Sequence, residues 1–552
     1  MSLTKVTYSM ISGASIYVAD YGAVGNGSID DTMAIQEALT AAAGKTLILA
    51  QNAVYKCTAG LMISGDINGQ GATLKFYGAA ISYLVSQSVE ASLSDFIIDG
   101  ANVTSCQAGL FVDTDFVQAD KCRWDLTINN ISNSNNTQGC SGALIYKSSS
   151  ASVNLNSDLD IRINVSGVTA TGNGTEGDTG GKASGILVAF NGTGCNGNVI
   201  IHDSVVKNVS SGATYPEEDS DGIHIFQGDF NVETAGGKWT VENCSVSDAR
   251  KRGVKVQAPN AYINNCRATG LMLAGFETYA YYTTFDGCAY RGTRMAFSTS
   301  LAGANIVNCF GRGSSTDQPV IAVYSASNNT KISNSIFIAA VSRVSEYVGV
   351  IKFYPGGLGS STVLDNVTLI CGTNTGSGIY IDGGPHYVTA RGVSVEGVRT
   401  GAFLYQADGS FTAIDSSFSV TGGSTVLVTN AVPKPTITLK NINGSGGNVN
   451  AGDSVLTLDN SIISKFGGGT AVYSTATGCR VSNSTINTDT ATDGVNVGNS
   501  LVQNNRINTA KNGVVYSYTT AAEVSGNVAV GCITPYVTTG FTAFVNVNNF
   551  SR

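Results

Sequence analysis

The chain of 552 residues is poor in charge, in proline and in histidine. Charged residues make up 13 % of it against 42 % apolar residues, a balance that can build a folded core and excludes a disordered protein. The formal net charge of −8 argues against a general nucleic-acid binder. Only three histidines occur (His202, His224 and His386), far apart in the sequence, so we expect no histidine-based metal site and no cofactor.

Long apolar segments are missing as well. No stretch reaches the roughly 18 apolar residues that a membrane-spanning helix needs. The opening residues, Met-Ser-Leu-Thr-Lys-Val-Thr-Tyr, contain no apolar segment of the secretory type. We therefore expect a soluble protein that has neither a membrane span nor an export signal of its own.

Twelve cysteines are present, but none lies in a C-x-x-C pair that would indicate a zinc ribbon or a redox motif. Their spacing is regular instead. The regularly spaced residues, separated by 22, 22 and 21 positions, are Cys244, Cys266, Cys288 and Cys309. Because a disulfide framework rarely repeats at one fixed interval, we interpret them as small buried residues stacked in register rather than as disulfides.

The same interval returns near the C-terminus. Blocks such as L-D-N-S-I-I and V-S-N-S-T-I recur at intervals of 23, 21 and 22 residues, at Ser461, Ser484, Asn505 and Asn527. Short segments that alternate apolar and polar residues lie between Gly, Asn, Asp and Ser turns, which indicates strands. A period near 22 residues is typical of one coil of a parallel β-solenoid, whereas a propeller needs about 40 residues per repeat. The sequence therefore predicts an all-β chain built as one elongated solenoid domain.

The open end of a solenoid must be covered, and residues 30–44 have the pattern of a short capping helix. Asp30 or Asp31 can cap its start, and Gly44 suits its end. Its apolar face consists of Ile35, Ala38, Leu39 and Ala42. The segment T-L-I-L-A at residues 46–50 follows at once, and we expect it to begin the first strand.

Residues 18–39, V-A-D-Y-G-A-V-G-N-G-S-I-D-D-T-M-A-I-Q-E-A-L, resemble the opening of the pectate-lyase-like right-handed β-helix superfamily. The preceding T-K-V-T-Y-S-M-I-S-G-A resembles the neck of bacteriophage tailspike proteins. The resemblance implies a right-handed parallel β-helix in a homotrimer that sits on the virion tail and depolymerises bacterial surface polysaccharide. It also implies that other virion tail proteins are partners, through an N-terminal part for which there is no room before residue 18.

These observations suggest a division of the chain into four parts. We expect a neck at residues 1–19 and a cap region with the helix at residues 20–44. The parallel β-helix, with carbohydrate binding and catalysis, is expected at residues 45–530. Residues 531–552 are expected to finish the β-helix or to tie the three chains together.

Carboxylates are concentrated between residues 215 and 230, in Y-P-E-E-D-S-D-G-I-H-I-F-Q-G-D-F. They are Glu217, Glu218, Asp219, Asp221 and Asp229. Crowded carboxylates raise one another's pKa, which allows an acid and a base to coexist at neutral pH. The alternative is a solvated loop or a calcium-binding turn.

The segment D-S-D-G-I at residues 219–223 is also similar to the N-T-D-G-I motif of polygalacturonase-type glycoside hydrolases. That likeness implies a catalytic role for Asp221. The chain departs from the family on the next two coils, because Arg250 and Arg252 stand near the expected aspartates and Glu277 near the expected histidine. The family's mechanism therefore does not transfer whole.

The 22-residue period makes a separate prediction about neighbours. If Val254 and Val256 point inward, Lys255 points outward, and Glu277 lies beside it about 4.8 Å away on the next coil. His224 aligns one coil earlier. The predicted substrate-binding residues of this carbohydrate site are His224, Arg250, Arg252, Lys255, Tyr279 and Tyr281. An ordinary surface ion pair between Glu277 and Lys255 is the alternative.

Two enzymatic mechanisms fit these residues. In glycoside hydrolysis, Glu277 would act with one of Glu217, Glu218, Asp219 or Asp221. In β-elimination, Lys255 or Arg252 would remove a proton beside a uronate carboxyl group. We favour hydrolysis because carboxylates outnumber isolated bases. A receptor-binding fibre that grips polysaccharide without cutting it, an esterase and a secreted plant-cell-wall-degrading enzyme remain alternatives.

Overall fold

The structure is a computed structural model of the 552-residue chain. It describes the residues 14–114, 122–135, 138–147, 158–171, 181–191, 198–211, 220–233, 237–270, 272–324, 328–340, 344–355, 359–372, 375–429, 431–498, 500–516, 522–538, 544–547 and 550–551. The chain divides into two compact units, unit 1 (Met1–Gly292) and unit 2 (Thr293–Arg552), and each is described by itself. No helix in the described residues is long and apolar enough to cross a membrane.

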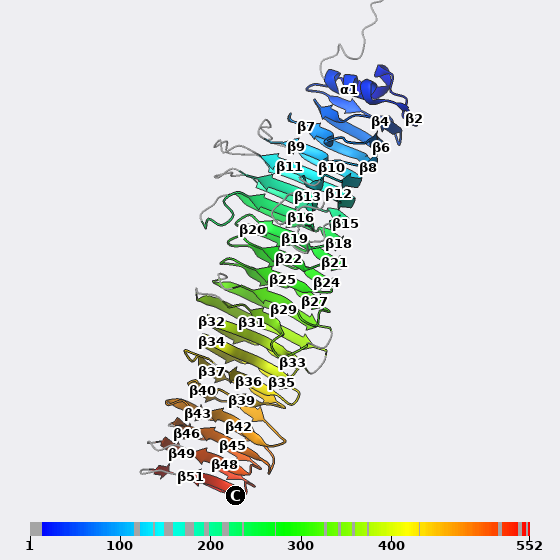
Figure 1. Ribbon diagram of the computed structural model, residues 1–552. Coiled ribbons are helices and arrows are strands. Elements are labelled where there is room, and N and C mark those ends of the chain that lie inside the picture. Colours follow the sequence, from blue (N-terminus) through cyan, green and yellow to red (C-terminus); the bar gives the residue numbers. More distant parts are fainter. Residues whose placement is uncertain are drawn as a thin grey trace, which may run out of the picture. The chain divides into compact units, whose positions relative to one another are not determined.

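Unit 1 consists of parallel strands stacked in three columns, drawn from blue to green in Figure 1. The first column contains β5 (Leu61–Ile63), β7 (Tyr83–Gln87), β9 (Ala108–Asp113), β11 (Cys140–Lys147), β13 (Ala183–Phe190), β16 (Ser220–Gln227), β19 (Arg252–Gln257) and β22 (Ala274–Thr278). The second contains β1 (Ile16–Tyr17), β3 (Thr46–Ile48), β14 (Asn198–His202), β17 (Lys238–Glu242), β20 (Ala261–Asn264) and β23 (Thr284–Asp286). The third contains β2 (Asn26–Asp30), β4 (Val54–Cys57), β15 (Val205–Ser211), β18 (Ser245–Ala249), β21 (Arg267–Gly270) and β24 (Ala289–Gly292). Four long strands serve both the second and the third column: β6 (Asp66–Gly78), β8 (Leu93–Val103), β10 (Arg123–Asn133) and β12 (Asp158–Ala170).

The core of unit 1 lies between these columns. Along each strand, buried apolar side chains alternate with side chains on the outer face, as the period of two requires. Val254 and Val256 of β19 are fully buried, as predicted, and they pair in register with Phe276 and Thr278 of β22. The predicted all-β class and the parallel stacking are confirmed.

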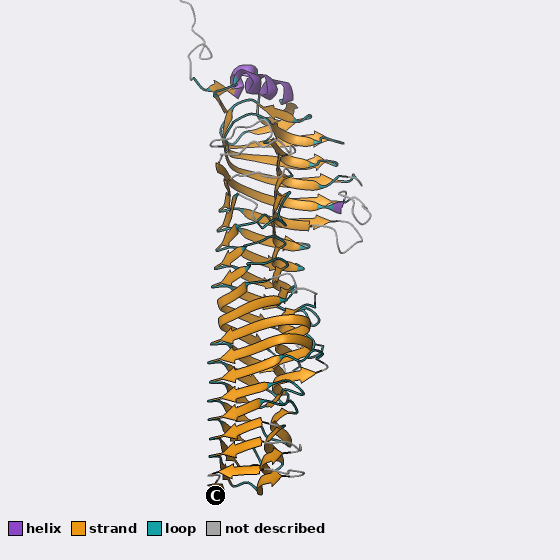
Figure 2. Ribbon diagram, turned by 90° about the vertical axis from the view of Figure 1, so that its left-hand side faces the viewer, coloured by secondary structure: helices purple, strands orange, loops and turns teal. Residues whose placement is uncertain are grey.

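The helix α1 (Thr32–Ala41) contacts β1, β4 and β5 of unit 1, and Figure 2 shows it beyond the first strands. A short 3₁₀ helix, η2 (Val18–Tyr21), precedes it. The predicted apolar face is confirmed, because Ile35, Ala38, Leu39 and Ala42 are all buried.

The prediction that the first strand follows this helix is wrong. β1 and β2 come before α1, and Ile16 pairs with Leu47 of β3. These strands were missed because two and five residues are too few to display a periodic pattern. The residue at the N-cap position is Asp31, but its carboxylate accepts hydrogen bonds from the backbone N–H groups of Val24 (2.7 Å) and Gly25 (3.1 Å).

The turn between the second and third columns explains the repeated Asn-Cys pair. Asn243 and Asn265 adopt left-handed backbone conformations, with φ of +52° and +49°. Asparagine tolerates this region, and here its side chains form a ladder in which Asn265 Nδ2 donates to Asn243 Oδ1 at 2.8 Å. The next residue points into the core, where the thiol of Cys266 donates to the Val241 carbonyl at 3.5 Å. The cysteines at this position of unit 1 are buried and form no disulfide, as predicted: Cys244, Cys266 and Cys288.

Unit 2 has three columns of its own, drawn from green to red in Figure 1. The first contains β25 (Met295–Thr299), β28 (Ile321–Val323), β30 (Gly349–Phe353), β36 (Ser424–Thr429), β39 (Asn448–Asn450), β42 (Gly469–Ser474), β45 (Thr492–Val497), β48 (Asn512–Tyr516) and β51 (Thr534–Thr538). The second contains β26 (Asn305–Val307), β37 (Thr436–Lys440), β40 (Leu456–Asp459), β43 (Cys479–Ser482), β46 (Ser500–Gln503), β49 (Ala522–Ser525) and β52 (Phe544–Val547). The third contains β27 (Phe310–Gly313), β33 (Ser394–Val398), β35 (Ser417–Val420), β38 (Asn443–Ser445), β41 (Ile462–Ser464), β44 (Thr485–Asn487), β47 (Arg506–Asn508), β50 (Val528–Val530) and β53 (Phe550–Ser551). Four strands serve two columns each: β29 (Thr330–Ala339), β31 (Ser360–Cys371), β32 (Ser377–Arg391) and β34 (Thr400–Ile414).

The repeat predicted near the C-terminus is a column of buried polar side chains in unit 2. The backbone N–H of Ser461 donates to Ser484 Oγ (3.1 Å), and that of Ser484 to Asn505 Oδ1 (2.9 Å). The backbone N–H of Asn505 in turn donates to Asn527 Oδ1 (2.9 Å). The side chains of Ser484, Asn505 and Asn527 therefore each accept a hydrogen bond from the backbone of the preceding repeat, which allows them to be buried.

Candidate functional site

The candidate site lies on the outer face of the first column of unit 1, across β16, β19 and β22. Each strand has a glycine near its start, and at two of them a side chain of the third column lies close by. A Cβ on Gly222 would lie 2.2 Å from Val246, and one on Gly253 would lie 2.7 Å from Ala268. The residues just before these glycines, Asp221 and Arg252, pair in register on neighbouring strands.

Arg252 joins the two carboxylates of the site. Its Nη1 lies 3.3 Å from Asp221 Oδ1, and its Nε donates to Glu277 Oε2. Its Nη2 donates to the hydroxyl of Tyr279 at 3.1 Å. A single guanidinium group therefore binds one residue from the preceding strand and two from the following strand or its end.

Lys255 and His224 complete the charged group. His224, Lys255 and Glu277 pair in register on three successive strands of the column; the 22-residue spacing predicts the pairing of Lys255 with Glu277. Asp221 Oδ2 lies 3.9 Å from Lys255 Nζ and 3.8 Å from His224 Nδ1. His224 Nε2 forms a hydrogen bond with Gln257 Oε1 at 2.9 Å. We name these six residues the Asp221 cluster: Asp221, His224, Arg252, Lys255, Glu277 and Tyr279.

The charged side chains of the Asp221 cluster are nearly inaccessible to solvent. The exposed fraction is 0 % for Asp221, 5 % for Arg252, 6 % for Glu277 and 7 % for Lys255. His224, at 12 %, is the most exposed of these five side chains. The alternative of an ordinary surface ion pair is therefore wrong for Glu277 and Lys255. Ions buried to this degree need partners, and the cluster brings two acidic side chains together with an arginine and a lysine.

Tyr279 forms one side of the cluster. Its ring centroid lies 5.6 Å from Arg252 Cζ and 6.0 Å from Lys255 Nζ, within the range of cation–π contacts. Burial, and after it the nearby charge of Glu277, raises the pKa of Tyr279. The Tyr279 hydroxyl therefore stays protonated at neutral pH. The Tyr279 side chain is half-buried, so part of it is available to a ligand.

Five of the predicted site residues do not belong to this cluster. Arg250 donates to the Ser211 carbonyl, and the ring of Tyr281 packs on Tyr282 with centroids 6.1 Å apart. The predicted catalytic residues Glu217, Glu218 and Asp219 lie outside the described residues. In the described part of the chain, no group of three or more His, Cys, Asp and Glu side chains could hold a metal ion.

A pocket that the sequence analysis missed lies on the same column. Its volume is about 230 Å³, and Leu144 of β11 and Leu187 of β13 line it together with Gln107, Ser141, Tyr146 and Lys182. Leu144 pairs with Leu187, and Leu187 pairs with His224, so the pocket and the Asp221 cluster occupy successive strands of one face. The signal was the pattern S-G-A-L-I and S-G-I-L-V, which matches D-G-I-H-I with leucine in the outward position.

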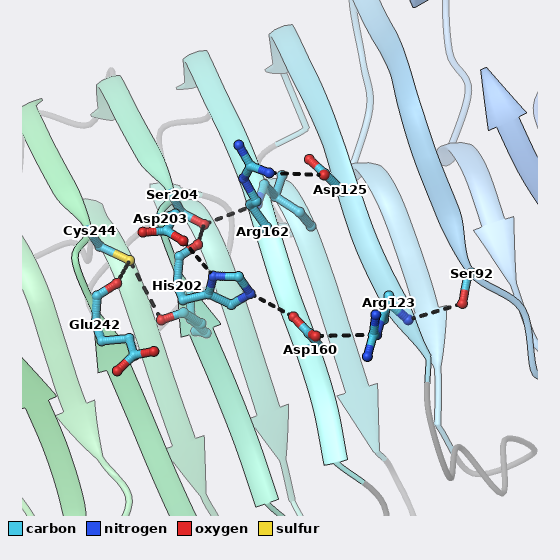
Figure 3. Close-up of polar contacts among 12 residues, drawn as sticks. Ser92, Arg123, Asp125, Asp160, Arg162, His202, Asp203, Ser204, Glu242 and Cys244 are labelled. Atoms are coloured by element: carbon cyan, nitrogen blue, oxygen red, sulfur yellow. Dashed lines mark hydrogen bonds and ion pairs between the residues drawn. The ribbon is translucent and has the colours of Figure 1, made fainter. Parts of the chain in front are cut away.

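A second charged group of unit 1 lies on the second column, and Figure 3 shows it. His202 is held between Asp160 (Nε2 to Oδ1, 2.7 Å) and Asp203 (Nδ1 to Oδ2, 2.9 Å). Asp160 also lies 3.4 Å from Arg123 Nε. These side chains are partly exposed and pair with one another along the strands, which is the arrangement of a surface ion-pair network.

Unit 2 carries an aromatic group on its own first column that the sequence analysis also missed. Lys352 Nζ lies 3.2 Å from Asp382 Oδ2, and 4.5 Å and 5.1 Å from the ring centroids of Tyr354 and Tyr380. Tyr324 stacks on Tyr354, with centroids 4.7 Å apart. We name these five residues the Lys352 cluster. Here too, a charged pair and aromatic faces occur together.

Comparisons with known proteins were made for sequence and for structure. No protein-family model and no curated protein matches the chain. Among solved structures, the bacteriophage phi29 gene product 12 N-terminal fragment is 12 % identical, over 97 % of this chain and 91 % of that one, with a TM-score of 0.46. The A-module of the Azotobacter vinelandii mannuronan C-5 epimerase AlgE6 is 14 % identical over 77 % and 99 %, with a TM-score of 0.39. Tailspike protein 3 of bacteriophage CBA120 is 10 % identical over 97 % and 61 %, with a TM-score of 0.24. Likenesses of this size assign neither an activity nor a substrate.

Proposed function

We propose that this chain is a bacteriophage tailspike that binds and depolymerises a bacterial surface polysaccharide, and that the Asp221 cluster is its cleavage site. The observation that carries the proposal is the position of Glu277. Its carboxylate is fixed by Arg252 beside Lys255 and Tyr279, on a face that continues into a pocket. A carboxylate, a cation and an aromatic ring on adjacent strands are the groups that a glycosidase uses to orient a sugar and cleave its linkage.

The finer features of the fold belong to the same proposal. We infer that the three columns close as a right-handed parallel β-helix with α1 as its cap. The protein would act as a homotrimer on the virion tail, attached to other tail proteins through an N-terminal part. The support for this inference is the motif at residues 18–39, together with the parallel register of the columns.

Hydrolysis is the proposed reaction. Glu277 would be the carboxyl group at the glycosidic oxygen or the anomeric carbon, because it reaches the outer face through the position that pairs with Lys255. Lys255 and His224 would bind sugar hydroxyl or carboxylate groups, and Tyr279 would pack against a ring. Asp221 is fully buried, so we assign it a positioning role: it holds Arg252, which holds Glu277.

The second carboxyl group that hydrolysis requires is not assigned within the Asp221 cluster. Glu217, Glu218 and Asp219 remain predicted candidates for it, because they precede Asp221 directly in the sequence. A carboxyl separation of about 5 Å from Glu277 would give retention of configuration, and one of about 6.5–9.5 Å would give inversion. The configuration of the first product, measured by NMR, therefore reports the separation.

One time course tests the reaction. Purified capsular and exopolysaccharides are incubated with the protein while polymer size and ultraviolet absorbance are followed together. We expect shortening without new absorbance. Shortening with the absorbance of an unsaturated sugar would mean β-elimination and would shift the chemistry from Glu277 to Lys255 or Arg252.

A receptor-binding fibre that does not cut its ligand is the second candidate function. One specific observation favours it: both carboxylates of the Asp221 cluster are already bound by Arg252, and Asp221 has no contact with solvent. Retention of the protein on a polysaccharide whose length never changes, across a broad panel of capsules, would support this function over cleavage.

A further inference from the structure

The pocket beside the Asp221 cluster has a chemical composition that selects a ligand. We propose that it binds an acetyl group on a sugar unit of the polysaccharide, so that the protein recognises acetylated glycans. This inference rests on the proposed function, because it assigns another unit of the same polymer to the pocket. It concerns the choice of substrate, whereas the Asp221 cluster concerns the reaction.

The lining of the pocket includes aliphatic side chains, on a face where the neighbouring strands are polar. Leu144 and Leu187 occupy outward positions of β11 and β13 and pair in register, whereas the next two strands present His224 and Lys255 at this position. Both leucines are only half-buried, and Ala189 is a further apolar residue in the lining of the pocket. Half-buried aliphatic side chains in a recess mark a place where an apolar ligand group replaces water.

The lining of the pocket also carries hydrogen-bond donors. Lys182 supplies an ammonium group, and Ser141 and Ser184 supply hydroxyl groups that lie on paired positions of β11 and β13. Tyr146 also lines the pocket, and its hydroxyl accepts a hydrogen bond from Asn191 at 2.8 Å. A ligand that fits both parts must present a small apolar end and an acceptor oxygen next to it.

An acetyl group has this combination. Its methyl group would lie on Leu144 and Leu187, and its carbonyl oxygen would accept a hydrogen bond from Lys182 or one of the serines. An unsubstituted pyranose offers the leucines its C–H face but no methyl group, and the hydroxyl groups around the ring would lose hydrogen-bonding partners where they meet the leucines. The register fixes the spacing along the face: Leu187 is one strand from His224 and three strands from Glu277, roughly 14 Å, so the acetylated unit would lie a few sugar units away from the linkage that Glu277 cleaves.

The test compares matched polymers. Binding is measured with the full chain carrying Glu277→Gln, so that cleavage does not shorten the ligand. The probes are an O-acetylated capsular polysaccharide before and after mild alkali, which removes ester-linked acetyl groups, and N-acetylglucosamine hexasaccharide beside its chemically deacetylated form. The first pair reports O-acetyl groups and the second N-acetyl groups. We expect at least a tenfold loss of affinity on deacetylation in one of the pairs.

Variants connect that preference to the pocket. Leu187→Ser and Leu144→Ser should each lower affinity for the acetylated form about tenfold and remove the preference, whereas Leu187→Met should retain it. Met62→Ser is the matched control, because Met62 is an exposed apolar side chain of β5 on the same column and outside the pocket.

The outcomes separate this inference from the proposed function. A preference for acetylated polymer that persists in Leu187→Ser and Leu144→Ser overturns the acetyl pocket. Equal binding and cleavage of acetylated and deacetylated polymers overturns the pocket and leaves the proposed function standing. The absence of both binding and cleavage for every polymer tested overturns both.

Discussion

Arg252 contacts both described carboxylates of the Asp221 cluster, so its removal should be the most damaging single substitution there. Arg252→Met leaves Asp221 and Glu277 buried without their shared cation, and we expect a loss of about 3–5 kcal/mol in the free energy of unfolding. Denaturant titration of the variant beside the parent measures this loss. Arg267→Met, which alters an exposed arginine of β21, is the control.

A variant that also neutralises the two carboxylates tests whether unpaired charge causes this loss of stability. If unpaired charge is the reason, adding Asp221→Asn and Glu277→Gln to Arg252→Met should recover more than half of the lost stability, because the neutral groups tolerate burial better. If Arg252→Met alone lowers the free energy of unfolding by less than about 0.5 kcal/mol, Arg252 does not stabilise the two buried carboxylates as we infer.

His202 gives unit 1 a stability that depends on pH. Burial alone would lower the pKa of His202, but hydrogen bonds with Asp203 and Asp160 outweigh burial and raise the pKa above its usual value. The folded protein therefore binds the proton more tightly than the unfolded chain does. This contribution is fully present below the unfolded pKa of about 6.5 and is lost as the pH rises through the raised pKa of the folded protein.

The melting temperature of the parent and of His202→Gln should accordingly converge at alkaline pH. We expect the parent to be the more stable protein at about pH 6 and the difference to shrink by about pH 8 or above. A difference that stays constant, or grows, as the pH rises would mean that the ring contributes by packing rather than by charge.

Single residues also show what the sequence could predict. The spacing of 22 placed Lys255 beside Glu277, because side-chain direction and register in a parallel stack depend on counting alone. It could not predict that Glu277 binds Arg252 instead, since that contact depends on the rotamer of a long side chain that crosses between strands. The burial of the Asp221 cluster could not be predicted either, because an outward position in the strand pattern does not show whether neighbouring side chains cover it.

Among the elements, the turn that leads from the second column to the third determines the repeat. Asn265 combines a left-handed backbone with a side-chain ladder to Asn243. Asn265→Val should cost about 1–2 kcal/mol from backbone strain alone, because a β-branched residue disfavours positive φ. Asn265→Gly removes the ladder but not the turn and should cost less. Thermal unfolding of the two variants side by side measures the difference, and an equal loss in both would show that the ladder dominates.

The elements were predicted best where the repeats are short. The turns at Asn243 and Asn265 are 22 residues apart, as the repeat requires, so strands in the region from β17 to β22 could be predicted. The long strands β6, β8, β10 and β12 could not, because each continues from the second column into the third without the turn residues that mark a strand end. The pocket at Leu144 and Leu187 lies in that less regular part, which is why it escaped the sequence analysis.

On the scale of the whole molecule, the proposed tailspike makes a prediction about assembly. We expect sedimentation equilibrium of the purified chain to give three times the mass of 56.8 kDa. Homotrimers are one of the closed symmetries open to identical chains, and the resemblance of residues 1–39 to tailspike necks and caps is the reason to expect one here. A monomer at micromolar concentration would contradict this part of the proposal.

We propose that unit 1 cleaves polysaccharide at Glu277, and a comparison of rates between two variants tests this proposal. The rate of polymer shortening is measured for Glu277→Gln and for Glu242→Gln, which makes the same change on β17 of the second column. We predict a loss of at least about 100-fold for Glu277→Gln in a variant that stays folded at the assay temperature, because Asp221 still pairs with Arg252, and parental activity for Glu242→Gln. Parental activity of Glu277→Gln on a polymer that the protein shortens would contradict the account and direct the search to the Lys352 cluster of unit 2.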